Sequence, residues 1–250
     1  MAVAVGMKMR LDKYLADMDC GTRAQVKKII SSGQVSVNGS PVKKPETKID
    51  TETDEVLCQG RKVAYAEYEY YMLNKPAGVI SAATDRREKT VVDLIVDRQR
   101  KDLFPAGRLD KDTEGLLLIT NDGELSHRLL SPRHHVDKVY FAKVDGCVTE
   151  EDVRHFSEGV DIGDDKPTLP AELRILCSGE VSEIELTIRE GRFHQVKRMF
   201  QAVGKEVVYL KRLKMGGLKL DPSLAPGQFR KLTEEEIGAL RNADADRKRE

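Results

Sequence analysis

The chain is 250 residues long, 40% hydrophobic and 34% charged, and its basic and acidic residues balance to a net charge of zero. This length is enough for one large or two modest domains with hydrophobic cores, and the composition excludes a wholly disordered chain. The chain contains no run of 18 apolar residues, which excludes an ordinary membrane-spanning helix.

The cysteines and the first residues indicate the compartment. Cys20, Cys58, Cys147 and Cys177 form no C-x-x-C pair, which argues against a zinc ribbon and a disulfide scaffold. The opening MAVAVGMKMR has no basic region ahead of its apolar stretch, unlike a signal peptide, and it leaves the translation start open among Met1, Met7 and Met9. We therefore expect a soluble, reduced, cytoplasmic protein.

Residues 8–44 predict a small basic unit. RLDKYLADM has apolar residues at helical spacing, Thr22 can cap a second helix over RAQVKKIISS, and Gly33 can end that helix. QVSVNGSPV predicts a strand followed by a hairpin turn at Asn38-Gly39. The span holds eight Lys and Arg residues against three Asp residues, a local charge of +5.

The positive charge by itself is equally compatible with a small solvated helical hairpin and with a domain that binds RNA. The order of two short helices and a strand ending in VNG, however, resembles an S4-type RNA-binding domain. That resemblance implies RNA contacts by basic side chains, which are Arg10, Lys13, Arg23, Lys27 and Lys28.

Residues 45–66 become acidic and end in GRKVAYAE, which we interpret as a linker. The expected organisation is an S4-like domain over 8–60, a second and larger domain over 67–240 and a disordered tail over 241–250, because RNADADRKRE has no apolar pattern.

Strands and helices alternate irregularly after the linker. The predicted strands are YYMLNK before Pro76, GLLLIT, KVYFAKVDG and SEIELTIREG; the predicted helices are GELSHRLL, TEEDVRHFSEGV and HQVKRMFQAVG. TVVDLIV is too short to assign to either type. Strands and helices without regular βαβ spacing predict an α+β fold with a mixed sheet.

The stretch GRLDKDTEGLLLITNDG, residues 107–123, places three carboxylates before a buried strand. A calcium loop is excluded because its twelfth position is Asn121, and a glycosidase site is disfavoured because the chain has no Trp on which a sugar ring would stack. We expect Asp112 and Glu114 to be solvated. Asp110 differs, because Arg108 shares its face in an extended chain and can keep it ionised in a dry site.

A second cluster, residues 186–219, holds nine basic residues against two Glu residues, with Phe193 and His194 interleaved. A solvated face is the ordinary explanation for any one of these charges. Together, on a strand, a turn and a helix, they favour a nucleic-acid surface.

These two stretches, GRLDKDTEGLLLITNDGELSHRLLSPRHHVDKVY and EGRFHQVKRMFQAVG, resemble the RsuA family of pseudouridine synthases, which act on the small ribosomal subunit. The resemblance covers about residues 9–240 and implies an S4 domain followed by a pseudouridine synthase domain, an α+β domain with a central mixed, largely antiparallel sheet. It also implies a reaction: a uridine in 16S ribosomal RNA is detached at its glycosidic bond, rotated and rejoined through C5, without a cofactor or metal.

The resemblance also implies roles for individual residues. Asp110 would be the nucleophile, Tyr140 would lie against the target base and is a candidate to accept the C5 proton, and Lys197 would pair with the catalytic carboxylate. Family members often have Arg in place of Lys197. Arg108 would fill the gap left by the flipped base and Leu186 would form an apolar wall. Further substrate contacts are expected from the basic motif, at Arg192, His194 and Arg198.

Two other functions remain open at this level. One is a non-catalytic S4-containing RNA-binding or ribosome-assembly factor, and the other is a metal-dependent phosphodiesterase using Asp110 and Asp112. His127, His134 and His135 lack metal-ligand spacing and indicate structural or RNA contacts. We expect a monomer whose partner is ribosomal RNA, free or in a partly assembled particle.

Overall fold

The computed structural model describes residues 7–242, and these form two compact units. The N-terminal unit extends to Glu69 and also includes Asp97–Leu103, while the C-terminal unit consists of Tyr70–Val96 and the chain from Phe104 onward. Most of the predicted tail, residues 243–250, lies outside the described residues.

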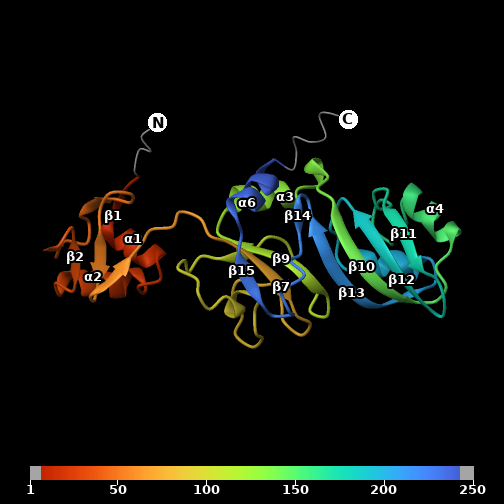
Figure 1. Ribbon diagram of the computed structural model, residues 1–250, viewed down its shortest axis with the longest axis horizontal. Coiled ribbons are helices and arrows are strands. Elements are labelled where there is room, and N and C mark those ends of the chain that lie inside the picture. Colours follow the sequence, from red (N-terminus) through yellow and green to blue (C-terminus); the bar gives the residue numbers. More distant parts are fainter. Residues whose placement is uncertain (1–6, 243–250) are drawn as a thin grey trace. The chain divides into compact units, whose positions relative to one another are not determined.

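The N-terminal unit has the two predicted helices, α1 (Leu11–Asp17) and α2 (Arg23–Ser31) (Figure 1). Thr22 caps α2 in a capping box with Gln25, as its position predicted. The strands of this unit are β1 (Lys8–Arg10), β2 (Val35–Val37), β3 (Ser40–Pro41), β4 (Lys48–Asp50), β5 (Val56–Cys58) and β6 (Arg61–Val63). They form a two-stranded sheet, β1-β4, and a four-stranded sheet in the order β3-β2-β5-β6.

Residues 61–66, expected to be a linker, belong to this unit. β6 pairs with β5, and the Tyr65 ring stacks on the Tyr14 ring with 5.3 Å between centroids. The Tyr14 hydroxyl donates a hydrogen bond of 2.7 Å to the Val63 carbonyl. Three-residue strands leave too little alternation in the sequence to distinguish them from a linker.

The segment Asp97–Leu103 returns to the N-terminal unit. The Glu69 carboxylate accepts hydrogen bonds from the backbone N–H groups of Gln99, at 3.0 Å, and Arg100, at 2.9 Å. The Arg100 guanidinium donates to the Ala66 carbonyl at 3.1 Å. These bonds fix the segment to the end of the N-terminal unit.

The C-terminal unit is built on a nine-stranded sheet. Its strands are β7 (Tyr70–Lys75), β8 (Phe104–Pro105), β9 (Glu114–Thr120), β10 (Lys138–Asp145), β11 (Glu172–Cys177), β12 (Val181–Ile188), β13 (Glu206–Met215), β14 (Leu218–Lys219) and β15 (Phe229–Lys231). The main path runs β11-β12-β10-β13-β9-β7-β15, with β14 on β13 and β8 on β9. Only the β9–β13 pairing among the described strands is parallel, so the sheet is mixed and largely antiparallel, as predicted.

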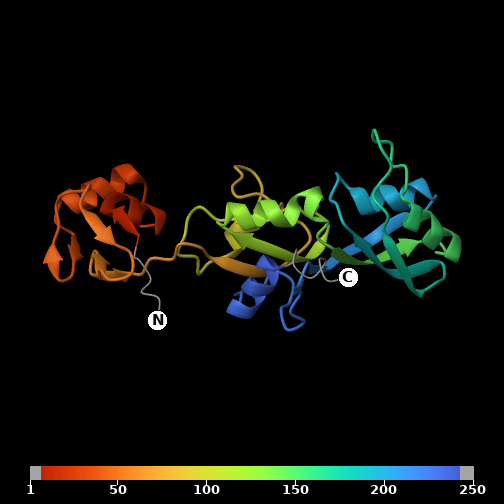
Figure 2. The same cartoon turned by 90° about the horizontal axis from the view of Figure 1, so that it is seen from above.

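Helices cover both halves of this sheet (Figures 1 and 2). They are α3 (Gly123–Leu130), α4 (Glu150–Glu158), α5 (Gln195–Ala202) and α6 (Glu234–Arg241), with 3-10 turns η1 (Val92–Leu94) and η2 (Pro132–His134). The short stretch left unassigned by the sequence is therefore η1. α6 includes Arg241, which the sequence assigned to the tail.

Two helix pairs make the cores of the two halves. Apolar residues of α3 and α6 pack with β7 and β9 in one buried cluster that includes Leu125, Leu240, Met72 and Leu118. α4 and α5 meet through Phe156 and Phe200, whose ring centroids are 4.9 Å apart. The two halves of the sheet join at the parallel β9–β13 pair, next to the loop that carries Asp110. No helix within residues 7–242 is long and apolar enough to cross a membrane.

Candidate active site

Asp110 lies in the loop that leads into β9, between two glycines that the backbone requires. Gly107 has φ of +90°, and a Cβ there would lie 2.7 Å from Leu130 Cδ2. Gly115 has φ of +99°, and a Cβ there would lie 2.3 Å from the Arg212 carbonyl oxygen of β13. Glycine is therefore needed both for the turn and for the close approach of β9 to β13.

Lys75 fixes the backbone of this loop through hydrogen bonds. It is fully buried at the end of β7, and its ammonium donates to the carbonyls of Pro76, Lys111 and Thr113 at 3.0, 3.2 and 2.8 Å. Burial lowers the pKa of Lys75 to about 8, although the nearby carboxylates of Asp112 and Asp110 oppose the shift.

Ser81 holds the loop on its other side. Its hydroxyl donates to the Leu109 carbonyl at 2.8 Å and accepts from the Leu109 N–H at 3.0 Å. The backbone directly before Asp110 is thereby fixed at both of its polar groups. The sequence analysis missed Ser81 and placed Lys75 only at the end of a predicted strand; the Pro76 that directly follows Lys75 was the signal that could have been used.

Lys197 and His194, from the basic motif, approach the carboxylates of this loop. Lys197 Nζ lies 3.5 Å from Asp110 Oδ2, and His194 Nε2 lies 3.5 Å from Asp110 Oδ1. The closer partner of Lys197 is Asp112, whose oxygens accept at 2.6 and 2.7 Å. This hydrogen bond with Lys197 is the main cause that lowers the pKa of Asp112.

Asp112 is exposed, as expected of a solvated residue, and Glu114 is half-buried, but both also have partners within the protein. Asp112 bridges to α5 through Lys197, and Glu114 accepts a hydrogen bond of 2.8 Å from the Tyr209 hydroxyl of β13. Both partners are at least 85 residues away in sequence, so no local pattern could reveal them.

Tyr140 and Asp110 both line a small cavity of about 70 Å³. Tyr140 is buried on β10, in register with Leu186 of β12 and Arg212 of β13. The cavity is lined by Arg108, Leu109, Asp110, Thr113, Tyr140, Ile188, Gly191, Arg192, His194, Gln195, Val196, Lys197 and Leu210. The cavity lining therefore contains a carboxylate, a phenol and several basic groups.

Leu186, assigned by resemblance as the apolar wall, is fully buried and is not among the lining residues. Ile188, two residues further on the same strand, lines the cavity together with Leu210 of β13. Side chains two apart on a strand share a face, so the sequence identified the correct strand face but the neighbouring position.

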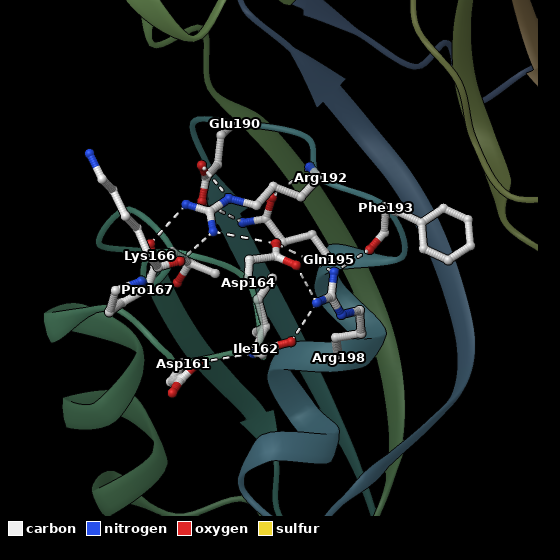
Figure 3. A network of polar contacts seen from close by, with 12 residues as sticks. Asp161, Ile162, Asp164, Lys166, Pro167, Glu190, Arg192, Phe193, Gln195 and Arg198 are labelled. Carbon is white, nitrogen blue, oxygen red and sulfur yellow. Dashed lines mark hydrogen bonds and ion pairs between the residues drawn. The ribbon is translucent and has the colours of Figure 1, made fainter.

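Arg192 and Arg198 are held by the protein itself (Figure 3). Arg192 donates to Glu190 at 3.0 Å and to the carbonyls of Lys166 and Pro167 at 2.6 and 2.8 Å. Arg198 donates to Asp164 at 2.6 Å. In the structure these arginines tie the loop around Asp164 to the start of α5, while Arg108 is exposed at the cavity.

Within residues 7–242, no group of three or more His, Cys, Asp or Glu side chains is arranged to hold a metal ion. The site's polar groups are instead paired carboxylates and cations. Such an arrangement can position a carboxylate as a nucleophile beside a partly apolar cavity.

Comparison with known proteins agrees with this geometry. A family model described as RNA pseudouridylate synthase matches residues 69–202, and one described as S4 domain matches residues 9–56. The chain belongs to the RNA pseudouridylate synthase family. This pseudouridine synthase is 49% identical over 239 residues to the RNA pseudouridine synthase YtzG of Bacillus subtilis, covering 95% of the chain and 100% of the relative.

Two further relatives carry a more specific name. The synthase is 42% identical over 234 residues to ribosomal small subunit pseudouridine synthase A of Escherichia coli strain K12, covering 93% and 100% of the two chains. It is also 42% identical over 233 residues to the protein of that name from Vibrio vulnificus, covering 93% and 99%. A solved pseudouridylate synthase crystal structure matches with a TM-score of 0.65 at 41% identity, covering 93% and 99%.

The S4 domain of this synthase displays most of its predicted RNA-binding residues. Lys13, Arg23, Lys27 and Lys28 are exposed on α1 and α2. Arg10 differs, because its guanidinium pairs at 3.0 Å with the buried Asp12. Arg10 therefore has a structural role in addition to any contact with RNA.

Proposed function

We propose that this synthase isomerises a uridine of small-subunit ribosomal RNA and that Asp110 is its nucleophile. The observation that carries the proposal is the position of Asp110 in the lining of a cavity that Tyr140 also lines, with two basic side chains at 3.5 Å from its carboxylate. The small-subunit substrate is supported by the names of the relatives from Escherichia coli and Vibrio vulnificus.

The proposed course of the reaction follows from this arrangement. A uridine must leave the base stack to reach an atom held in a cavity. The Asp110 carboxylate forms a covalent bond to the ribose or the ring, and the glycosidic bond to N1 breaks. After the base has rotated, C5 bonds to the ribose, the bond to Asp110 breaks, and the C5 proton is lost; Tyr140 is the candidate to accept it. Lys197 and His194 keep the carboxylate oriented before the attack.

The test is Asp110→Asn, which has a similar shape but cannot form the covalent bond. We expect tritium release from small-subunit RNA labelled at uridine C5 to be abolished while RNA binding stays nearly intact. Asp112→Asn, in the same loop, is the matched control and should retain more activity. Asp110→Asn activity within about tenfold of wild type, roughly 1.4 kcal/mol of barrier, would contradict the assignment.

The substrate is tested separately, by mapping pseudouridines in ribosomal RNA from cells with and without the protein. A pseudouridine that disappears from the small-subunit RNA identifies the target. An unchanged small-subunit RNA would refute the proposed substrate without affecting the assignment of Asp110. We further propose a cytoplasmic monomer that needs no cofactor and acts on free RNA or on a partly assembled particle.

A further inference from the structure

Phe193 is unusually exposed for an aromatic side chain beside a cavity. It is 75% exposed, whereas Tyr68, the next most exposed large aromatic of the described residues, is 43% exposed. It sits in the turn between β12 and α5, directly before His194. Covering the exposed Phe193 ring with a flat partner would remove apolar surface from water and so lower the free energy of the complex.

The ring is held in place and is not a loose surface group. It stacks on the His194 ring with 3.8 Å between centroids and 17° between planes. His194 has a left-handed backbone, with φ of 48°, and its ring lies face to face with the ring of Phe193. One face of Phe193 is thus covered by His194 and the other is open to a partner.

The backbone beneath the two rings is fixed by the network in Figure 3. Arg198 donates to the Phe193 carbonyl at 3.2 Å, and the Arg192 N–H donates to the Gln195 side chain at 2.9 Å. Gln195 in turn donates to the buried Glu190 at 3.1 Å. Figure 3 shows the Phe193 ring directed away from this network, so that the polar groups hold the turn while the ring remains outside.

The two stacked rings lie beside the catalytic cavity. His194, the inner ring, lines the cavity and is 3.5 Å from Asp110. A uridine drawn into the cavity leaves the base beside it without one stacking neighbour. Stacking of a base on an aromatic side chain contributes about 1–3 kcal/mol and tolerates any base, because every base has a π face.

The surroundings favour a nucleic acid over a protein partner. The residues next to Phe193 are Arg192 and His194, and Lys197 lies one helical turn on, so Phe193 is a single apolar group in a basic setting. A docked protein would require a contiguous apolar patch. We propose that Phe193, backed by His194, stacks against an unpaired nucleobase adjacent to the target uridine, an inference that rests on the proposed function.

The experiment places 2-aminopurine, a fluorescent base quenched by stacking, on either side of the uridine in a small-subunit RNA fragment. With the wild-type protein, we expect binding to change the fluorescence at one of the two positions. Phe193→Leu, which keeps an apolar side chain but no ring, should remove that change and weaken binding by roughly 5- to 150-fold. Phe193→Trp should restore both. Leu176→Ala, at another exposed apolar residue of the same unit, is the control and should behave as wild type.

Kinetics distinguish stacking from a defect in chemistry. Removing an interaction that is equally strong before and during the reaction raises KM and leaves kcat nearly unchanged. A Phe193→Leu protein that is folded by circular dichroism and binds with wild-type fluorescence and affinity overturns the inference, whether or not the RNA is converted. Absence of pseudouridine from wild-type reactions counts against the proposed function alone.

Discussion

At the scale of single residues, the main feature of the site is that one lysine, Lys197, lies close to two carboxylates. Lys197 lies 2.6 Å from Asp112 and 3.5 Å from Asp110, and only 20% of its side chain is exposed. Without Lys197, Asp112 loses its hydrogen-bonded cation and Asp110 loses one of its two basic neighbours. The repulsion between two negative charges on one loop is then no longer offset by the ammonium group.

Lys197→Met should therefore lower kcat by about tenfold to a hundredfold, with most of the activity recovered by Lys197→Arg, because the arginine restores the positive charge. Single-turnover rates on labelled small-subunit RNA measure the effect. Equal rates for the Met variant and wild type would show that the ion pair does not support the reaction.

At the scale of structural elements, Ser81 fixes the loop that carries Asp110. The Ser81 hydroxyl makes both a donated and an accepted hydrogen bond with the Leu109 backbone. Ser81→Ala leaves both groups without that partner, at a cost of about 1 kcal/mol for each bond. We expect kcat to fall by about threefold to thirtyfold, with KM little changed and with recovery in Ser81→Thr.

Steady-state kinetics of the Ser81 variants, with urea unfolding as a control, separate positioning from stability. A fall in stability with an unchanged kcat would mean that Ser81 only supports the fold.

β10 carries a second buried lysine whose ionisation should be visible in stability. Burial, followed by the nearby Arg212, lowers the pKa of Lys138 to about 8 from its ordinary value of 10.5. Between pH 8 and pH 10.5 the lysine of the unfolded chain binds a proton that the lysine of the folded chain does not. The free energy of unfolding therefore rises with pH by up to about 1.4 kcal/mol per unit in this range. This gain in stability is lost as pH falls through about 8, where Lys138 is protonated in the folded chain as well.

Lys138→Met removes this titration. We expect urea unfolding at pH 8 and pH 9.5 to show a smaller rise in stability for the variant than for wild type. The same rise in both proteins would mean that Lys138 keeps its ordinary pKa in the folded state.

What could be predicted from the sequence was local. Periodicity and capping residues gave α2, α3 and α5, and the two motifs gave the residues that the cavity brings together, including Asp110, Tyr140 and Lys197. The contacts made by Arg192 and Arg198 could not be predicted, because Asp164 and the carbonyls near it lie in an irregular loop about 28 and 34 residues earlier. Pairing across such distances is decided by folding, and no spacing rule encodes it.

At the scale of the whole molecule, the S4 domain should supply affinity through charge. Changing Lys13, Arg23, Lys27 and Lys28 together to Gln leaves its core intact, since all four are exposed. Each phosphate that a basic side chain no longer neutralises makes the slope of log K against log salt shallower by roughly 0.7–0.9. If these side chains neutralise about two to four phosphates, we expect a slope shallower by about 1.5–3.5 and an unchanged kcat at saturating RNA.

Binding titrations from low to moderate salt measure this slope. Lys219→Gln removes an exposed charge from the catalytic unit and is the control, with an expected shift below about 1. An unchanged slope in the quadruple variant would mean that these four side chains do not contact phosphate.

The return of Asp97–Leu103 to the N-terminal unit has a consequence for chimeras. Because the chain passes from one unit to the other near Glu69, again near Val96 and again near Leu103, the S4 unit is not one continuous cassette. In a chimera that takes residues 1–69 from a relative, Arg100 would still come from this synthase, whereas the groups at positions 66 and 69 that accept its hydrogen bonds would come from the relative. The two sets of residues would then have to be compatible. Exchange of RNA-binding units between family members must therefore transfer both segments together.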